Sequence, residues 1–309
     1  MNSNRREDQP FENAGVARYR SKPSIVIQRE PFQSEMELGV GVGQTDKEYV
    51  YVVGSVNAYF PNLGVEKEFY QACLLTGVDV SSLENINDEV SLARLNQSDS
   101  LSATLHQGFS KPENAYVARE MSWVFSNVDS NEVYRIFAES DESLMQLVAA
   151  LGAKHESIIM IGQLTGNGHV LLSNLIPIKS TPVRASLGAK SGDTEMLALA
   201  EEILSLNANN GLSNQERALN YLLYNNTKIY TESYDFCYKA NASGPNPSGY
   251  QLVSVDLLLS WSGDRLVSKV VFNYQGINTG AKQSWYSTVD VTGEYPFMLT
   301  DWKRFLPQY

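Results

Sequence analysis

The sequence predicts an α+β protein, with a mixed α/β first half and a second half in which helices precede an antiparallel meander. Two observations support this class. Before residue 180, apolar residues at helical spacing alternate with β-branched runs, whereas after it the helical patterns come first and three strand-like runs follow. With 43% apolar residues among 309, the chain can fill a substantial core. We expect a flexible segment over 1–45, an α/β half over 46–180, and helices with an antiparallel sheet over 181–309, all packed as one compact unit.

The first segment carries scattered charged, amide and proline residues without a sustained period, which is typical of a flexible leader. Gly39, Gly41 and Gly43 suggest a dinucleotide-binding fingerprint at its end. That motif needs a strand before the glycines and a helix that opens at them. Here the first strong strand pattern follows the glycines, so a hinge is the favoured interpretation.

The first half begins with EYVYVVGSVNAYF, whose β-branched and aromatic residues predict a strand or a bent hairpin. In GVEKEFYQACLL, Val65, Phe69, Ala72 and Cys73 recur at helical spacing, which places Cys73 on a buried helix face. Short helical pieces are expected around DEVSLARL. ENAYVAREMSWVFSN is ambiguous, and we favour a strand in its second half that pairs with EVYRIFAES across the turn NVDSN.

The sequence marks both ends of a helix in SDESLMQLVAALGA. Ser140 can cap its start, two acidic residues suit the first turn, and Gly152 is expected to close it. Strands are predicted for SIIMIGQL and HVLLSNLIPI. The Pro/Gly/Ser-rich stretch 180–192 is the expected boundary between the two halves.

The second half starts with two predicted helices. DTEMLALAEEILSLN places Leu197, Ala200 and Leu204 on one face. The SNQE that follows is a capping box, in which the Ser213 side chain accepts from the Glu216 amide while the Glu216 carboxylate reaches back. It marks RALNYLLYNNTKIY as a true helix start. YQLVSVDLLLSW, RLVSKVVFNYQ and SWYSTVDV then predict an antiparallel meander with helices on one face, the first two joined by the hairpin signal SGD.

Composition argues against several kinds of partner. A net charge of −11 and a pI near 4.8 provide no electrostatic footprint for nucleic acid. No run approaches the ~20 apolar residues of a membrane helix, and residues 1–15 lack the apolar core of a secretory signal. A cytoplasmic protein without a membrane partner is therefore expected. The two cysteines and three histidines form no metal-binding pair, so we expect neither a metal nor a cofactor.

No recognised catalytic motif occurs, and we assign no catalytic residue. Arg217 nevertheless stands near the first turn of its helix, where the helix dipole disfavours a cation. We expect the carboxylate of Asp290 or Glu294 to pair with it and join the last strand of the meander to this helix. If Arg217 instead binds a peptide carboxylate, the ligand site would comprise Arg217, Asn220, Tyr221 and Glu294.

Four stretches carry a family resemblance: YVYVVGSVNAYFPNLGVEKEFYQA, ENAYVAREMSWVF, RALNYLLYNNTKIY and VDVTGEYPFMLT. Their order resembles that in the C-terminal domain of PatA/PatG-type cyanobactin maturation proteases, and the resemblance covers roughly residues 47–301. That domain is separate from the protease domain. This chain departs from the family pattern at Ser122, where a cysteine is expected before the tryptophan, and in NGHVLLSN, which lacks the usual cysteine.

The resemblance implies a place in a pathway for ribosomally made, post-translationally modified peptides, and it does not transfer protease or macrocyclase activity. We expect a non-catalytic binding or scaffolding protein that holds the precursor peptide or a peptide-modifying enzyme. The alternative is an enzyme that modifies such a peptide without a recognisable catalytic motif. An enzyme would change the mass of the precursor, whereas a binder would not. A homodimer is left open.

Overall fold

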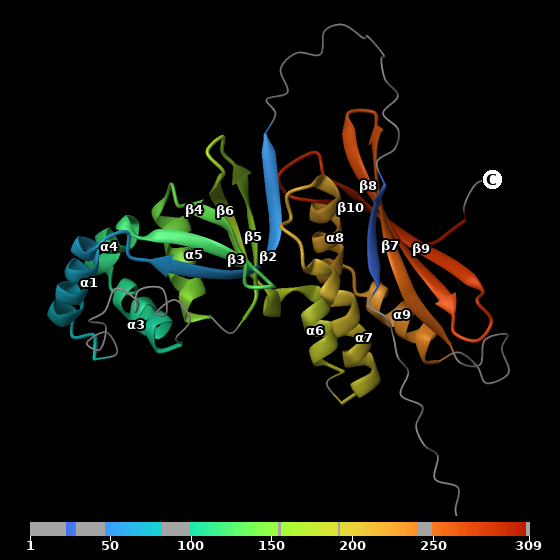
Figure 1. Ribbon diagram of the computed structural model, residues 1–309, viewed down its shortest axis with the longest axis horizontal. Coiled ribbons are helices and arrows are strands. Elements are labelled where there is room, and N and C mark those ends of the chain that lie inside the picture. The colour runs from blue at the N-terminus through green and yellow to red at the C-terminus, as the bar shows by residue number, and fades with distance from the viewer. Residues whose placement is uncertain are drawn as a thin grey trace, which may run out of the picture.

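The computed structural model describes residues 23–28, 47–81, 99–153, 156–190, 192–239 and 249–306. A closed five-stranded barrel lies at one end and an open five-stranded sheet at the other, with a layer of helices between them (Figure 1). The predicted α+β class is confirmed.

The barrel contains β2 (Glu48–Tyr59), β3 (Ser122–Asn127), β4 (Glu132–Phe137), β5 (Ile158–Leu164) and β6 (His169–Pro177), in the order β2-β3-β4-β6-β5. β2 is one long strand, which pairs with β5 up to Gly54 and with β3 from Gly54 onward. A Cβ at Gly54 would overlap the carbonyl oxygen of Ser126, so this crossing point requires glycine. The predicted β3–β4 hairpin is confirmed. The short parallel pairing of β4 with β6 closes the barrel, and the sequence did not predict that closure.

The helices that pack on the barrel are α1 (Leu63–Thr76), α3 (Asp99–Phe109), the 3-10 turn η1 (Pro112–Asn114), α4 (Ala115–Glu120) and α5 (Asp141–Gly152). The buried face predicted for α1 and the Ser140 cap of α5 are confirmed. Helix α5 ends at Gly152 as predicted, although Gly152 is its last helical residue and Ala153 is the C-cap. A Cβ on Gly152 would lie 2.7 Å from Nε2 of His106, so this glycine makes room for a neighbouring helix. The stretch DEVSLARL lies outside the described residues.

The helical layer contains η2 (Ile178–Ser180), α6 (Pro182–Gly188), α7 (Thr194–Leu204), η3 (Ser205–Asn207), α8 (Asn214–Asn225) and α9 (Lys228–Cys237). The expected boundary stretch 180–192 therefore includes a helix, which Thr181 caps. Of the predicted face of α7, Ala200 is buried and Leu204 is half-buried against the hydrophobic core, whereas Leu197 is half-buried and lies outside that core. The buried stripe instead consists of Met196, Leu199, Ala200 and Ile203, an unbroken series at helical spacing.

The open sheet contains β1 (Ser24–Gln28), β7 (Tyr250–Ser262), β8 (Arg265–Gly276), β9 (Lys282–Asp290) and β10 (Phe297–Phe305), in the order β1-β7-β8-β9-β10. The predicted meander of β7, β8 and β9 is confirmed, and β10 extends it beyond the prediction. β1 pairs parallel to β7. For Ser24–Gln28, the expectation of a flexible segment without regular structure is therefore wrong, because β7 offers this segment a strand edge.

Two hydrophobic cores share the barrel wall. Along β2, Val50 and Val52 point into the barrel core, whereas Tyr51 and Val53 point into a second core formed with the helical layer and the open sheet. Helix α8 lies at the centre of this second core and contacts β2, β7, β8 and β9. The barrel and the open sheet, which belong to the two halves expected from the sequence, are thus packed together through α8. The residue boundaries assigned to those halves stay predictions.

Neither cysteine takes part in a disulfide, and both are buried. Burial raises the pKa of the Cys73 thiol to about 11, so almost no thiolate exists at neutral pH. We expect iodoacetamide at pH 8 to leave Cys73 unmodified in the folded protein and to alkylate it fully in denaturant, as measured by peptide mass spectrometry. Rapid alkylation without denaturant would show that the α1 face opens readily.

Candidate functional site

Helix α8 begins with the predicted capping box, which fixes where its first turn lies. The Ser213 hydroxyl accepts from the amide of Glu216 at 3.2 Å, and the Glu216 carboxylate accepts from the amides of Ser213 and Leu212, each at 3.2 Å. This reciprocal cap satisfies backbone donors that the helix cannot satisfy internally. It also directs the next residue, Arg217, towards the open sheet.

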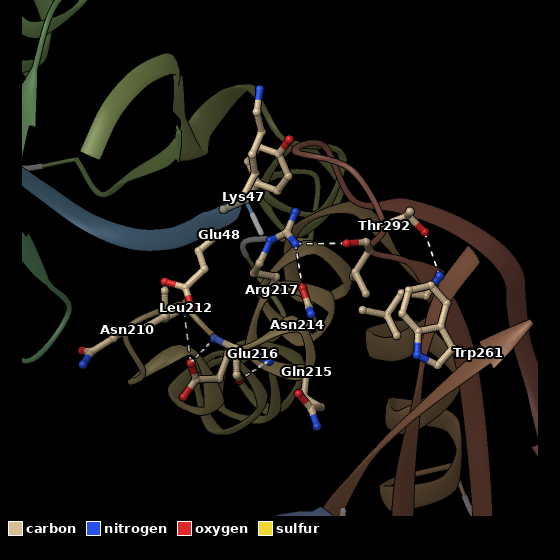
Figure 2. A pocket seen from close by; sticks show the side chains of 14 residues that line it. Lys47, Glu48, Asn210, Leu212, Asn214, Gln215, Glu216, Arg217, Trp261 and Thr292 are labelled. Atoms are coloured by element: carbon tan, nitrogen blue, oxygen red, sulfur yellow. Dashed lines mark hydrogen bonds between the residues drawn. The ribbon is translucent and has the colours of Figure 1, made fainter. Parts of the chain in front are cut away.

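Arg217 is only 1% exposed, and its guanidinium binds main-chain carbonyl groups. Nη1 donates to the carbonyl oxygen of Val291 at 3.0 Å and to Oδ1 of Asn214 at 2.8 Å. Nη2 donates to the carbonyl oxygens of Gly293 and Glu294. Arg217 therefore holds the segment between β9 and β10 against the start of α8 (Figure 2).

The predicted direct ion pair of Arg217 with Asp290 or Glu294 does not form, although the charge of Glu294 acts on Arg217 from a distance and opposes the lowering of its pKa by burial. The predicted connection between α8 and the end of the meander is correct. The carboxylate of Glu294 accepts from the hydroxyl of Ser173 on β6. The carboxylate of Asp290 accepts from Thr292 and lies 3.8 Å from Nε of Arg265. Three convergent carbonyl groups make the direct contacts that were expected from a carboxylate, because the turn after β9 presents its main chain to the helix.

Burial lowers the pKa of Arg217 to about 10, a value at which the guanidinium stays protonated at neutral pH. The ring of Tyr49 lies under the guanidinium, with its centroid 5.4 Å from Cζ. The charge is thus stabilised by main-chain dipoles, by one aromatic face and, at longer range, by the carboxylate of Glu294. Such an arrangement stabilises the join between α8 and the open sheet and leaves the cation little freedom to bind a ligand.

Asn220 and Tyr221 lie on the part of α8 that faces the barrel. Asn220 Nδ2 donates to the carbonyl oxygen of Tyr51 at 2.9 Å, and the amide groups of Asn220 and Asn209 pair reciprocally at 2.9 and 2.8 Å. The amide of Tyr51 donates to the carbonyl oxygen of Gly211 at 2.9 Å. Together these four residues form what we call the β2 clasp (Tyr51, Asn209, Gly211 and Asn220). The clasp binds the edge of β2 over the half of the strand that β3 does not cover. The Tyr221 ring packs edge-on against the Tyr51 ring at 6.1 Å.

A cleft of about 780 Å³ lies next to Arg217, between the start of β2, the first turn of α8 and the β7–β8 hairpin. Figure 2 shows Trp261 of the hairpin on one side and Glu216 of α8 on the other, with Arg217 between them. Trp261 is 61% exposed and Leu212 is 41% exposed, so an indole and an aliphatic side chain are available at its surface.

Carboxylates set the electrostatic character of one side of the cleft. Glu48 and Glu216 both line it, and their charges add to burial in raising the pKa of Tyr134 to about 12. Lys47 supplies a cation at the rim. The accessible chemistry is therefore acidic on one side and aromatic on the other, which suits a ligand that carries both a basic and an apolar group.

Of the four residues proposed for a ligand site, only Arg217 lines this cleft. Asn220 belongs to the β2 clasp, Tyr221 belongs to the second core, and Glu294 binds the barrel. Sequence reasoning missed Trp261. The available signal was the hairpin sequence SGD directly after it, because a large aromatic side chain beside a tight turn is often exposed.

Over the part of the chain that the structure describes, no group of three or more His, Cys, Asp or Glu side chains is placed to hold a metal ion. Ser122, the position at which the family pattern has cysteine, lines a separate cleft on the barrel that His169 also lines. Within the same part of the chain, no helix combines the length and the apolar character needed to cross a membrane.

The fold and the cleft define a class of protein: a closed barrel and an open sheet joined by a helix whose buried arginine binds main-chain carbonyls. The chain belongs to the PatG domain family, because the family model described as "PatG Domain" matches residues 49–239 and the one described as "PatG C-terminal" matches residues 189–305. The two matches overlap over α7, α8 and α9, the helices between the two sheets.

A solved structure of a "PatG Domain of Unknown Function" has a similar fold. Its TM-score is 0.56 at 14% sequence identity, and the alignment covers 84% of this chain and 98% of that one. No curated protein matches this sequence. The family resemblance read from the four sequence stretches is therefore confirmed.

Proposed function

We propose that this chain is a non-catalytic binding module in a pathway for ribosomally made, modified peptides of the cyanobactin type, and that its cleft holds a segment of the precursor peptide. Membership of the PatG domain family supports the pathway. The cleft beside α8 supports the binding role. Its volume of about 780 Å³ is of the size that accommodates small ligands or a few peptide side chains.

The observation that carries this proposal is which groups around Arg217 are already hydrogen-bonded within the protein and which remain available to a ligand. Both Nη atoms of the guanidinium donate to internal acceptors, and one oxygen of the Glu216 carboxylate accepts from the amides of the helix cap. The groups left for a ligand are therefore the Trp261 indole, Leu212, the Glu48 carboxylate and the second oxygen of Glu216. An exposed tryptophan is a frequent anchor for a bound side chain, because it buries a large area at a low entropic cost. A peptide with an apolar residue beside a basic one fits this arrangement.

We expect Trp261→Ala to weaken binding of a fluorescent cyanobactin precursor peptide by about tenfold or more, since anchoring aromatic residues dominate such interfaces. Phe297→Ala is the matched control, because Phe297 is 64% exposed, close to the 61% of Trp261, and lies outside the cleft. Fluorescence anisotropy measures the affinity, and thermal melting checks that both variants fold. Equal affinity in all three proteins would remove the cleft from the proposal.

The mass of the precursor decides between binding and catalysis. After incubation with the wild-type chain alone, a binding module leaves the mass unchanged. A mass change that depends on the chain would overturn the non-catalytic role and favour the alternative, an enzyme that modifies the peptide. If a peptide-modifying enzyme is the partner instead, Trp261→Ala should weaken capture of that enzyme and leave affinity for the precursor unaltered.

A further inference from the structure

The open sheet ends in a strand that differs from its neighbours. β1 pairs parallel to β7, whereas every other pairing in this sheet is antiparallel among the described residues. It covers Ser254–Leu258 only, so β7 extends beyond it at both ends. Figure 1 shows β1 in dark blue alongside β7, and the strand order places it at the edge of the sheet.

The side chains of β1 contribute little to the second core. Ile25, Val26 and Ile27 are 38%, 39% and 47% exposed. The β7 partners of Ile25 and Ile27, which are Val255 and Leu257, are fully buried, and the partner of Val26 is Asp256. None of the three β1 side chains belongs to the core cluster or to the partly buried residues packed against it. β1 is therefore held mainly by main-chain hydrogen bonds, which any extended peptide can make.

We infer that the edge of β7 is a strand-addition site for an extended aliphatic peptide, and that residues 24–28 occupy it as an internal, displaceable ligand. The continuous run of Ile25, Val26 and Ile27 indicates the preferred ligand, a segment of β-branched apolar residues. The ligand replaces β1 strand for strand, so the sheet keeps its edge covered throughout.

The site leads towards the cleft. Trp261 lies three positions beyond Leu258 on the same strand, and β1 runs parallel to β7 in that direction. A peptide added along β7 would thus continue towards the cleft beside α8. The inference rests on the proposed peptide-binding function, yet it concerns a separate contact surface, so the two can fail independently.

Competition from β1 predicts weak binding by the intact chain. A segment attached to its own site acts at an effective concentration that reaches about millimolar, so a free peptide must overcome it. Releasing β1 should strengthen binding of an added peptide, and locking β1 in place should abolish it.

The experiment uses a disulfide lock. Val26 and Asp256 are partners in the β1–β7 register, so the double variant Val26→Cys with Asp256→Cys can join the two strands on oxidation. The two native cysteines are buried and do not interfere. The probe is a fluorescent peptide that copies residues 23–29 (PSIVIQR), and the control peptide has proline at the positions of Ile25 and Val26.

We expect the reduced variant to bind the probe and the oxidised variant to bind it at least about tenfold more weakly, with no binding of the control peptide. In the full chain, the double variant Ile25→Pro with Val26→Pro should bind the probe at least about tenfold more tightly than wild type. The backbone N–H groups of adjacent residues in a strand point to opposite sides, so one of the two prolines removes an N–H donor that faces β7 and thereby releases β1. If this variant fails to fold, the oxidised and reduced states of the cysteine variant still decide the question.

Two results would overturn the inference. One is equal affinity of the oxidised and reduced cysteine variant for the probe. The other is a disulfide that links two chains on a non-reducing gel, which would make the β7 edge a site for exchange between copies. The proposed function fails in a different way, namely when precursor binding does not depend on Trp261.

Discussion

Replacing Arg217 with alanine should lower the free energy of unfolding by about 3 kcal/mol or more, since it leaves buried carbonyl groups without donors. The carbonyl oxygens of Val291, Gly293 and Glu294 all accept from this one side chain. Each unsatisfied buried acceptor costs about 1–3 kcal/mol, and water entering from the neighbouring cleft recovers part of the loss. Urea denaturation followed by circular dichroism measures the difference.

Arg265→Ala is the matched control for this experiment. Arg265 is 58% exposed at its side chain and lies 3.8 Å from Asp290, so its removal should cost less than about 1 kcal/mol. Arg217→Lys should fall between the two, because one ammonium group cannot reach carbonyl groups that a planar fork contacts together. If Arg217→Ala keeps the wild-type stability but loses precursor binding, the guanidinium is a ligand group and its structural role here is wrong.

The local elements of this protein could be read from its sequence because each depends on residues close together in the chain. The capping box of Ser213 and Glu216 is complete within four residues, and it marks the start of α8 correctly. The Ser140 cap and the β7–β8 hairpin belong to the same kind of signal. Periodicity likewise placed Cys73 on the buried side of α1.

The features that the sequence did not reveal depend on partners far apart in the chain. β1 pairs with β7 across more than two hundred residues, and its five-residue pattern is too short to be recognised without its neighbour. Gly152 illustrates a second limit. A glycine near a helix end predicts a cap, but here it accommodates the His106 ring from α3, a contact that only the tertiary fold creates.

The candidate site likewise combines features that nearby residues encode with features that depend on residues far apart in the chain. The sequence singled out Arg217 and the segment 290–294 as partners, and that connection exists. It suggested the wrong acceptor because a pairing argument considers side-chain charges, whereas a tight turn can aim several main-chain carbonyl groups at one cation. The cleft itself requires β2, α8 and the β7–β8 hairpin to meet, so no single stretch of sequence contains it.

Gly211 provides the second large expected effect, because it combines a backbone constraint with a steric one. Its φ of +60° lies in the left-handed region, which costs an alanine about 1 kcal/mol. A Cβ at this position would also overlap the carbonyl oxygen of Tyr51, which the β2 clasp holds in place through Asn220. Main chain lies on both sides of this contact, so neither atom can move without breaking the Tyr51–Gly211 hydrogen bond.

We therefore expect Gly211→Ala to lower the free energy of unfolding by about 3 kcal/mol or more, the sum of left-handed strain, the lost hydrogen bond and the displaced clasp. Gly77→Ala separates the causes, because Gly77 has a similar φ of +70° and nothing within 4 Å of its Cβ position. It should lose only about 1 kcal/mol. Urea titration of both variants measures the difference, which is the cost of the overlap with Tyr51 together with the hydrogen bond and clasp contacts that it disrupts. Equal losses would show that the loop before α8 shifts freely, in which case the clasp does not hold the barrel to the helical layer.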